Sequence, residues 1–533
     1  MKKIFHNGRV ITMDPSLPQA EAFMVKKGKI LALGTDDEIL AGAGSSTRKL
    51  DLAGNAVLPA FTDSHTHLYL SASQRGWIDL RDARSAGDII QAIFDTHPRQ
   101  GREEWILGRG WDQNRMDSPG LPSLEDLDRV TGKSPLFLER ICGHAALVNS
   151  AALDLAGLNG ELVNPPGGRI VREKGLALDE AAGIVKSFVE PPSGRSMEKL
   201  LREAADELLS LGIGGVHDVG ITPEALDIYT RLSQEEDFRF RVTGYFPAMG
   251  AQPEEAVAQV LAARQRENDF LSLNGVKLFA DGSLGARSAA LLDDYSDDPG
   301  NRGIMVMEPG ELYRYILAVH NAGLQAAVHA IGDRANRMVL DMFERLFAES
   351  PSDNPRHRIE HAQLVDPSDT GRFARLGIIP SVQFSHCISD YTWIEERIGE
   401  ARLMAAYPWR SLVDSGCRLA AGSDLPFENV IDPFAGILAA AARTTTRGEP
   451  QGGWMPEEII PAMEAVRAYT VHSAYASFHE GRRGRIAPGM DADFLVISPG
   501  ILEMDRDNIG QARVLATVVE GEIVYSSPES DLH

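Results

Sequence analysis

Residues 57–67 read VLPAFTDSHTH, an apolar run that ends in two histidines separated by a single residue. Alternate side chains of a β-strand point to the same side, so His65 and His67 would project together and could bind one metal ion. The pair alone is weak evidence, because a surface loop with two histidines explains an H-x-H motif equally well.

Six more apolar runs along the chain end in polar or ionisable residues. They are IGGVHDVG (213–220), NGVKLFADG (274–282), LQAAVHAIGD (324–333), HRIEHAQ (357–363), IIPSVQFSH (378–386) and RLAAGSD (418–424). Amphipathic helical stretches separate the runs, a pattern typical of parallel βα units in either a barrel or a doubly wound sheet. Barrel enzymes carry their catalytic groups at strand carboxyl ends, which makes Lys277, His329, His361 and Asp424 further candidate ligands. Imidazoles with a carboxylate suit Zn²⁺ or a similar divalent ion.

Both ends of the chain favour short β-strands. Residues 1–58 alternate in polarity around Asn7-Gly8 and Lys27-Gly28, and the far end contains ADFLVISPG and ARVLATVVEGEIVYSS. Turn-prone glycines separate these runs. We predict a composite β-sandwich domain from residues 1–58 and 481–533, and a barrel over residues 59–480 with an inserted lobe near its mouth at about residues 70–210.

Composition narrows the class of protein. The 533 residues are 43% hydrophobic, and 53 Lys and Arg against 76 Asp and Glu give a formal net charge of -23. This charge disfavours nucleic acid or an anionic membrane as a partner. Neither a signal peptide nor a membrane-spanning stretch is indicated, and the three cysteines, Cys142, Cys387 and Cys417, argue against a disulfide framework. We expect a cytoplasmic protein that acts on a small-molecule substrate.

Five segments, in chain order, carry a family resemblance: TDSHTH, VKLFADGSLGARSA, VHAIGDRAN, RIEHAQ and GSD. They resemble the amidohydrolase superfamily, and more narrowly the branch of N-substituted formamide deformylase-like metal-dependent hydrolases, amidohydrolase family 3. PPGGR, LGIGGVHD and the terminal segments extend the similarity over nearly the whole chain. The resemblance implies a TIM-like (β/α)₈ metallo-hydrolase barrel that cleaves an amide, N-formyl or related carbon–nitrogen bond other than a peptide bond. Tight dimers are common among such relatives, although nothing in the sequence decides whether this chain forms a homodimer.

The resemblance also implies a role for each candidate ligand in a site with two Zn ions. His65 and His67 would bind the more buried ion together with Asp424, while His329 and His361 would bind the second. Lys277 would bridge both ions as a carboxylated lysine, because a free ammonium repels cations whereas its carbamate offers two anionic oxygens. The alternative is an ion pair of Lys277 with Asp281 or Asp424 and a single metal.

The chemistry expected from such a site is attack by a metal-activated water on a substrate carbonyl. Asp424 would accept the proton of the water and deliver it to the leaving nitrogen. Fold and metals do not fix the bond that is cleaved, so hydrolysis of a lactone or phosphoester remains an alternative. A catalytically silent barrel scaffold is another, although the full ligand set is present here.

Substrate contacts are harder to predict than ligands. The candidates are Trp111, His144, Arg287, Phe384 and His386. Trp111 could equally be ordinary packing of the inserted lobe, and Arg287 could pair with an acidic substrate group or form a salt bridge to Asp281 or Asp293. Phe384 departs from the Gln-Pro of relatives at a position expected to line the pocket. His217 is either a substrate contact or a satisfied interior histidine.

Overall fold

The computed structural model describes residues 2–96, 104–113, 116–117, 120–141, 143, 145–158, 164–165, 168–190, 192–248, 250–428, 430–498, 505–530 and 532. The chain divides into two compact units. The first combines residues 1–72 and 198–533, and the second is Ser73–Met197. His144 and Cys142 lie outside the described residues, so the predicted substrate contact of His144 stays a prediction.

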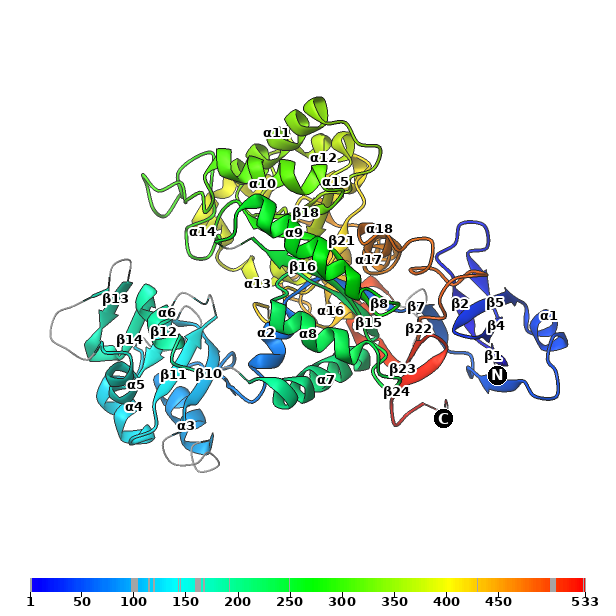
Figure 1. Cartoon of the computed structure of the whole chain (residues 1–533), viewed down its shortest axis with the longest axis horizontal. Coiled ribbons are helices and arrows are strands. Elements are labelled where there is room, and N and C mark those ends of the chain that lie inside the picture. The colour runs from blue at the N-terminus through cyan, green and yellow to red at the C-terminus, as the bar shows by residue number, and fades with distance from the viewer. Residues whose placement is uncertain are drawn as a thin grey trace. The chain divides into compact units, whose positions relative to one another are not determined.

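An eight-stranded parallel sheet forms the centre of the first unit, in the spatial order β21-β20-β19-β18-β17-β16-β15-β8 (Figure 1). The strands are β8 (Phe61–Thr66), β15 (Ile213–Asp218), β16 (Arg241–Pro247), β17 (Leu271–Phe279), β18 (Gln325–Ala330), β19 (Arg358–His361), β20 (Ile379–Val382) and β21 (Ala420–Ala421). Hydrogen bonds from Asp424 N to His65 O and from His67 N to Leu425 O join the two ends. The sheet is therefore a nearly closed barrel, which confirms the fold class and decides between a barrel and a doubly wound sheet.

Helices follow the barrel strands along the chain. They are α2 (Leu68–Ser73), α7 (Gly194–Ser210), α8 (Pro223–Leu232), α9 (Pro253–Ala263), α10 (Pro309–Asn321), α11 (Asp333–Glu349), α12 (Thr370–Leu376), α13 (Phe384–Asp390), α14 (Ile394–Ile398), α15 (Trp409–Asp414), α16 (Pro433–Ala442), α17 (Ala462–Tyr469) and α18 (Val471–Ala476). Helices α9 and α10, for example, pack against β17 and against each other, so they cover the outer face of the barrel, while side chains of the strands fill its interior. This explains why the strands read as continuous apolar runs.

The two chain ends form two further sheets in the same unit. A four-stranded sheet contains β5 (Lys29–Gly34), β4 (Ala22–Lys26), β1 (Lys2–His6) and β6 (Arg48–Asp51), next to α1 (Asp36–Ala41). A six-stranded sheet contains β24 (Glu522–Ser526), β23 (Arg513–Val519), β22 (Phe494–Ser498), β7 (Ala56–Pro59), β2 (Arg9–Ile11) and β3 (Gln19–Ala20). Strand β22 pairs with β7, so the C-terminal segment completes a sheet that the N-terminal segment begins.

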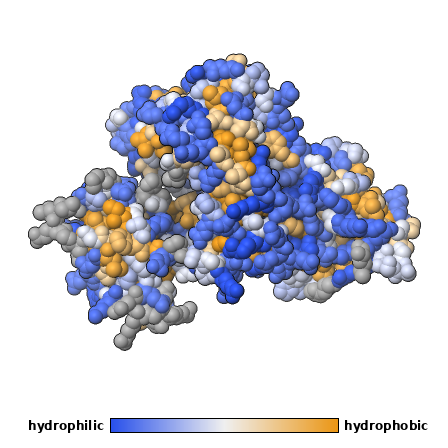
Figure 2. All heavy atoms as spheres, in the orientation of Figure 1, coloured by the Kyte–Doolittle hydropathy of each residue, from blue (hydrophilic) through white to orange (hydrophobic). Residues whose placement is uncertain are grey.

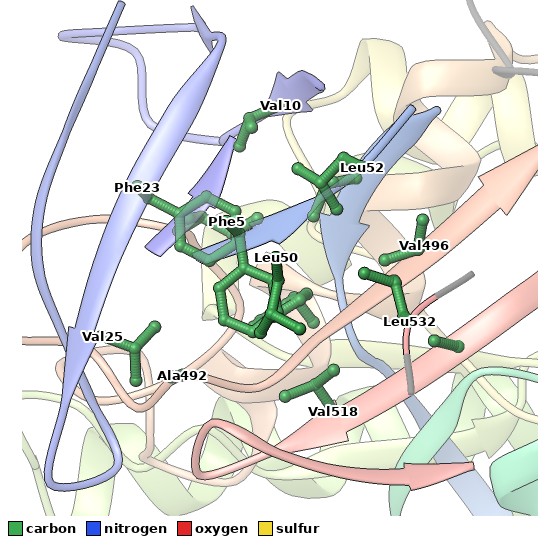
Figure 3. Packing of buried hydrophobic residues seen from close by; sticks show 14 of the residues in the cluster. Phe5, Val10, Phe23, Val25, Leu50, Leu52, Ala492, Val496, Val518 and Leu532 are labelled. Atoms are coloured by element: carbon green, nitrogen blue, oxygen red, sulfur yellow. The ribbon is translucent and has the colours of Figure 1, made fainter. Parts of the chain in front are cut away.

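One hydrophobic core joins these two sheets (Figure 3). The rings of Phe5 and Phe23 stack at 5.1 Å, and the ring of Phe494 meets each edge-on at 4.9 Å. Such aromatic pairs stabilise the packing by more than the burial of their apolar surface alone. Residues almost 500 positions apart are thereby held in one sandwich, as the alternating terminal runs predict, while the exact domain limits stay a prediction.

The second unit has its own sheet and its own core. The sheet runs β13 (Gly168–Val171), β14 (Leu176–Asp179), β12 (Ala145–Val148), β11 (Leu136–Arg140), β10 (Ile106–Trp111) and β9 (Ile78–Asp79). Helices α3 (Ala86–Thr96), α4 (Leu124–Thr131), α5 (Ser150–Leu155) and α6 (Glu180–Lys186) accompany it. The predicted insertion at about residues 70–210 includes this whole unit.

The described surface, helices and cysteines show neither a membrane-spanning helix nor a disulfide bond. The face drawn in Figure 2 is mostly hydrophilic, with hydrophobic residues in separate patches. Among the described helices, none is long and apolar enough to cross a membrane. Cys387 and Cys417 are both buried and unpaired.

Candidate metal centre

His65 and His67 lie at the carboxyl end of β8 and just beyond it. His65 is fully buried, and its Nδ1 donates to Glu360 Oε2 at 2.5 Å. A carboxylate can only accept here, so the remaining nitrogen of a neutral His65, Nε2, carries the lone pair. The His67 ring lies 5.7 Å from the His65 ring, centroid to centroid. The side chain of His67 is 17% exposed, which leaves the pair accessible from one side.

Asp424 approaches both histidines from the segment after β21. Its Oδ1 lies 3.4 Å from His65 Nε2 and 3.4 Å from His67 Nε2. The backbone of Asp424 is left-handed, with a φ of 61°, a conformation that persists at a non-glycine residue only when its surroundings enforce it. Gly422 allows this close approach, because a Cβ there would lie 2.3 Å from His65 N. The Gly-Ser-Asp segment thus places the carboxylate directly over β8.

Lys277 lies on β17 with its side chain inside the barrel and 1% exposed. Its Nζ is 3.3 Å from His65 Nε2. No carboxylate oxygen of a described residue lies within 4.0 Å of Nζ, so the alternative ion pairs with Asp281 and Asp424 are not formed. Burial lowers the pKa of Lys277 to about 8, which makes the neutral amine accessible near physiological pH.

His329 and His361 complete the cluster from β18 and β19. Their rings meet edge-on at 4.5 Å, and the His361 ring lies 4.9 Å from that of His65. His361 also has left-handed backbone, with a φ of 74°. Its Nδ1 is 2.8 Å from the Gln383 side-chain oxygen, and His329 Nε2 is 3.2 Å from the carbonyl of Gly282. Both contacts are to acceptors, so His361 Nε2 and His329 Nδ1 are the nitrogens left with lone pairs.

Burial keeps these imidazoles neutral. It lowers the pKa of His329 to about 3 and holds the pKa of His361 well below the usual value. Burial by itself would raise the pKa of Asp424, but the imidazoles of His65 and His67 beside its carboxylate hold that pKa well below its ordinary value. His329 and His361 therefore present neutral nitrogen donors beside an ionised carboxylate.

A glycine and an aspartate shape the loops around the cluster. Asp281 accepts hydrogen bonds from the backbone N–H groups of Ala290, Ile331 and Gly332 at 2.9, 3.0 and 2.8 Å. A Cβ at Gly332 would lie 2.0 Å from the carbonyl oxygen of Ala290. The segment after β18 can therefore pack on the segment after β17, which explains why Asp281 and Gly332 stand in these motifs.

The positions of the three donors suit a divalent ion. Ligand atoms of His65, His67 and Asp424 all lie within 4.8 Å of one another. Ligands at Zn²⁺ distances in a tetrahedral site are separated by about 3.3 Å, close to the two nitrogen–oxygen distances of 3.4 Å. The residues present therefore fit a metal, and Lys277, His329 and His361 lie beside them.

His386 is a predicted substrate contact that the structure places beside the cluster. It sits on α13, its ring stacks on that of His361 at 6.1 Å, and its Nε2 is 4.0 Å from Asp424 Oδ2. Glu428 Oε2 lies 3.9 Å from the same nitrogen. The imidazole is 16% exposed and could therefore reach a bound molecule.

Three other predicted contacts have partners of their own in the described structure. Phe384 is fully buried against Trp409 and Tyr469, so the expectation that it lines the pocket is wrong, because α13 turns the ring into the core. Arg287 forms a bidentate ion pair with Asp297, at 3.1 and 2.7 Å, in place of Asp281 or Asp293. Trp111 is 1% exposed in the core of the second unit and donates to Leu138 O, which favours packing over substrate contact.

Sequence reasoning missed the residues that hold the ligands. Glu360 and Gln383 fix the ring orientations of His65 and His361. The sequence does contain a signal for Glu360: Arg358 and Glu360 are two opposite charges inside an apolar strand. Charges buried in such a strand must be paired, which indicates a polar network beside the ligands.

Known proteins resemble this chain over most of its length. A family model described as "Amidohydrolase family" matches residues 48–525. YtcJ of Bacillus subtilis is 33% identical over 98% of this chain and 99% of its own length. N-substituted formamide deformylase of Arthrobacter pascens is 27% identical over 97% of each chain. The crystal structure of an uncharacterized metal-dependent hydrolase from Pyrococcus horikoshii OT3 matches with a TM-score of 0.78 and 28% identity, covering 95% of this chain and 99% of that one.

Proposed function

The chain belongs to the amidohydrolase family, and from this membership we propose that it hydrolyses a non-peptide carbon–nitrogen bond, such as an amide or N-formyl bond, in a small molecule. The observation that carries the proposal is the convergence of His65, His67 and Asp424 at the end of the barrel. A relative named N-substituted formamide deformylase, aligned over nearly the whole chain, supports the choice of bond.

The residues that would hold metal divide into two groups around Lys277. His65, His67 and Asp424 would hold one Zn²⁺, and His329 and His361 the other. Lys277 would be carboxylated and serve both, since no carboxylate of a described residue pairs with its Nζ and its lowered pKa favours the amine that reacts with CO₂. Such ions supply Lewis acidity and an activated water when bound.

Asp424 is the proton carrier of the proposed reaction. Its Oδ1 faces the two histidines, while its Oδ2 lies 4.0 Å from His386 Nε2. A carboxylate held ionised in this position can accept the proton of the attacking water and return it to the departing nitrogen. Carbon–nitrogen cleavage then ends with a neutral amine and a carboxylic acid, so the proton balance closes on Asp424.

The charges around the cluster favour a substrate without an acidic group. Arg287, the predicted partner of such a group, is already paired with Asp297. Carboxylate oxygens of Asp424 and Glu428 both lie close to His386 Nε2, at 4.0 and 3.9 Å. In the described part of the first unit, the cluster thus offers carboxylates and the side chain of His386 to the substrate, and we expect neutral amides and formamides to be preferred.

Metal removal combined with a substrate panel tests the proposal. The panel contains N-formyl amines, simple amides, lactones and phosphotriesters, and the products are identified. We expect the metal-loaded protein to release amines, chelation to abolish this hydrolysis, and added Zn²⁺ to restore it.

Two other results would overturn the proposal in different ways. Turnover of only lactones or phosphotriesters would assign a different bond to the same site. Bound metal with no turnover of any panel member would instead favour the silent scaffold.

A further inference from the structure

A chain of buried polar side chains extends from His65 toward the amino-terminal end of the barrel. Glu360 accepts from His65 and is bound in turn by Arg358, with Nε to Oε1 at 2.8 Å and Nη2 to Oε2 at 2.9 Å. The guanidinium also donates to the Ser64 carbonyl at 2.6 Å and to the Ser381 hydroxyl at 2.8 Å. Both Arg358 and Glu360 are fully buried, so each needs its partners to offset the loss of water.

His217, on β15, is the last member of this chain. Its Nδ1 lies 2.9 Å from Arg358 Nη1. A guanidinium donates and never accepts, so Nδ1 must carry the lone pair and Nε2 must carry the proton. His217 is 1% exposed, and this burial holds its pKa well below the usual value, although the Ser64 carbonyl acts to raise it. Among the described residues, Nε2 has no hydrogen-bond partner of acceptable length and angle. A buried donor left in this state costs free energy unless an acceptor is supplied.

A small cavity adjoins His217 beneath the barrel. Its volume is about 30 Å³, and it is lined by residues of β8, β15, β16 and α18 and of the segments that follow α18. Polar side chains of the lining include Thr243, Ser477, His479 and Asp493. One water requires about 10–15 Å³ of such volume and two to four polar partners, so the cavity has room for one or two waters.

The charges around the cavity favour water over an anion. Its two arginines are already neutralised: Arg241 binds Asp493 in a bidentate pair at 2.6 and 3.0 Å, and Arg483 binds Asp491 at 3.2 Å. An anion would lie close to the Asp493 carboxylate without an unpaired cation to compensate it. A neutral acceptor that can also donate meets the requirements of this lining.

We propose that this cavity holds an ordered water that accepts the proton of His217 Nε2, and that the His217–Arg358–Glu360 chain is the device that positions His65. The water fixes the His217 tautomer, the tautomer gives Arg358 an acceptor, and Arg358 holds the Glu360 carboxylate against His65 Nδ1. His217 is thus a positioning residue for a ligand three side chains away. This inference rests on the proposed metal site only for its functional readout.

Zinc affinity of the apo-protein, measured by competition with a chromophoric chelator, tests the positioning role. His217→Phe removes one of the two acceptors of Arg358 Nη1, leaving only the Tyr245 hydroxyl at 3.1 Å, and it removes the donor to the water. We expect the Zn²⁺ dissociation constant to rise about 10–100-fold, as for other supports of metal-bound histidines. His217→Gln keeps an acceptor and a donor and should restore affinity to within a few-fold. His472→Gln, at a half-buried histidine that takes no part in the His217–Arg358–Glu360 hydrogen bonds, is the matched control and should leave affinity unchanged.

The outcomes separate this inference from the proposed function. Equal zinc affinities for His217→Phe and His472→Gln would overturn the positioning role, even if the wild-type protein hydrolyses amides. Zinc binding without hydrolysis would count against the proposed function. The zinc affinities of the variants would still test the positioning role of His217.

A crystal structure of the wild-type protein provides a second test, and this test does not depend on whether His217→Phe folds. It should show an ordered water within hydrogen-bond distance of Nε2, and an empty cavity would overturn the proposal.

Discussion

Replacing Asp424 with asparagine is expected to lower kcat by about 10²–10⁴-fold while much of the bound metal is retained. The amide oxygen can still face His65 and His67, whose nitrogens lie 3.4 Å from the present carboxylate oxygen. An amide, however, cannot accept and return a proton at neutral pH. The check is a steady-state assay on the best amide of the panel, with metal content determined on the same samples.

Asp297→Asn provides the control for this experiment. Asp297 is a carboxylate of the same unit that pairs with Arg287 and Arg397, away from the ligand cluster. Its replacement should leave kcat within a few-fold of the wild-type value. If Asp424→Asn turned over substrate at a near-normal rate, Asp424 would not be the proton carrier.

Replacing Lys277 with alanine is expected to remove one of the two proposed metal ions and most of the activity. Without the carbamate, His329 and His361 lose the anionic ligand that would offset the charge of a second ion. The deletion also leaves a buried space where the side chain ran. Formate, acetate or propionate can enter this space as a carboxylate, and we expect each to restore metal content and activity in part.

Lys277→Met separates the missing charge from the missing volume. Its side chain fills the space that alanine opens, so metal content should fall as in Lys277→Ala, but short carboxylic acids should not restore it. The reading of Lys277 as a bridging ligand would be abandoned if either variant kept the wild-type metal content.

Much of the barrel could be predicted because seven of its strands end in a residue with chemistry. His65, Lys277, His329 and His361 all lie at the ends of strands of one parallel sheet, and Asp424 follows its last strand. Strand β16 is different. It ends at Pro247 without an ionisable group, so the pattern of an apolar run followed by a polar residue does not identify this strand.

The details that failed are those that depend on tertiary packing. Phe384 starts a helix whose direction no local pattern specifies, and the buried face of that helix decides that its ring joins Trp409 in the core. Arg287 finds Asp297 because the loop after β17 folds back on itself. The chain of His217, Arg358 and Glu360 crosses between β15 and β19, which are distant in sequence, so neither motif reveals the contact.

Crystals grown with Zn²⁺ and measured at its absorption edge test the two-metal site. We expect two anomalous peaks, one among His65, His67 and Asp424 and one beside His329 and His361, with density continuing from Lys277 Nζ between them. A single peak beside a free Lys277 amine would contradict the two-metal site. Anomalous peaks only at other places in the molecule would contradict the hydrolase assignment itself.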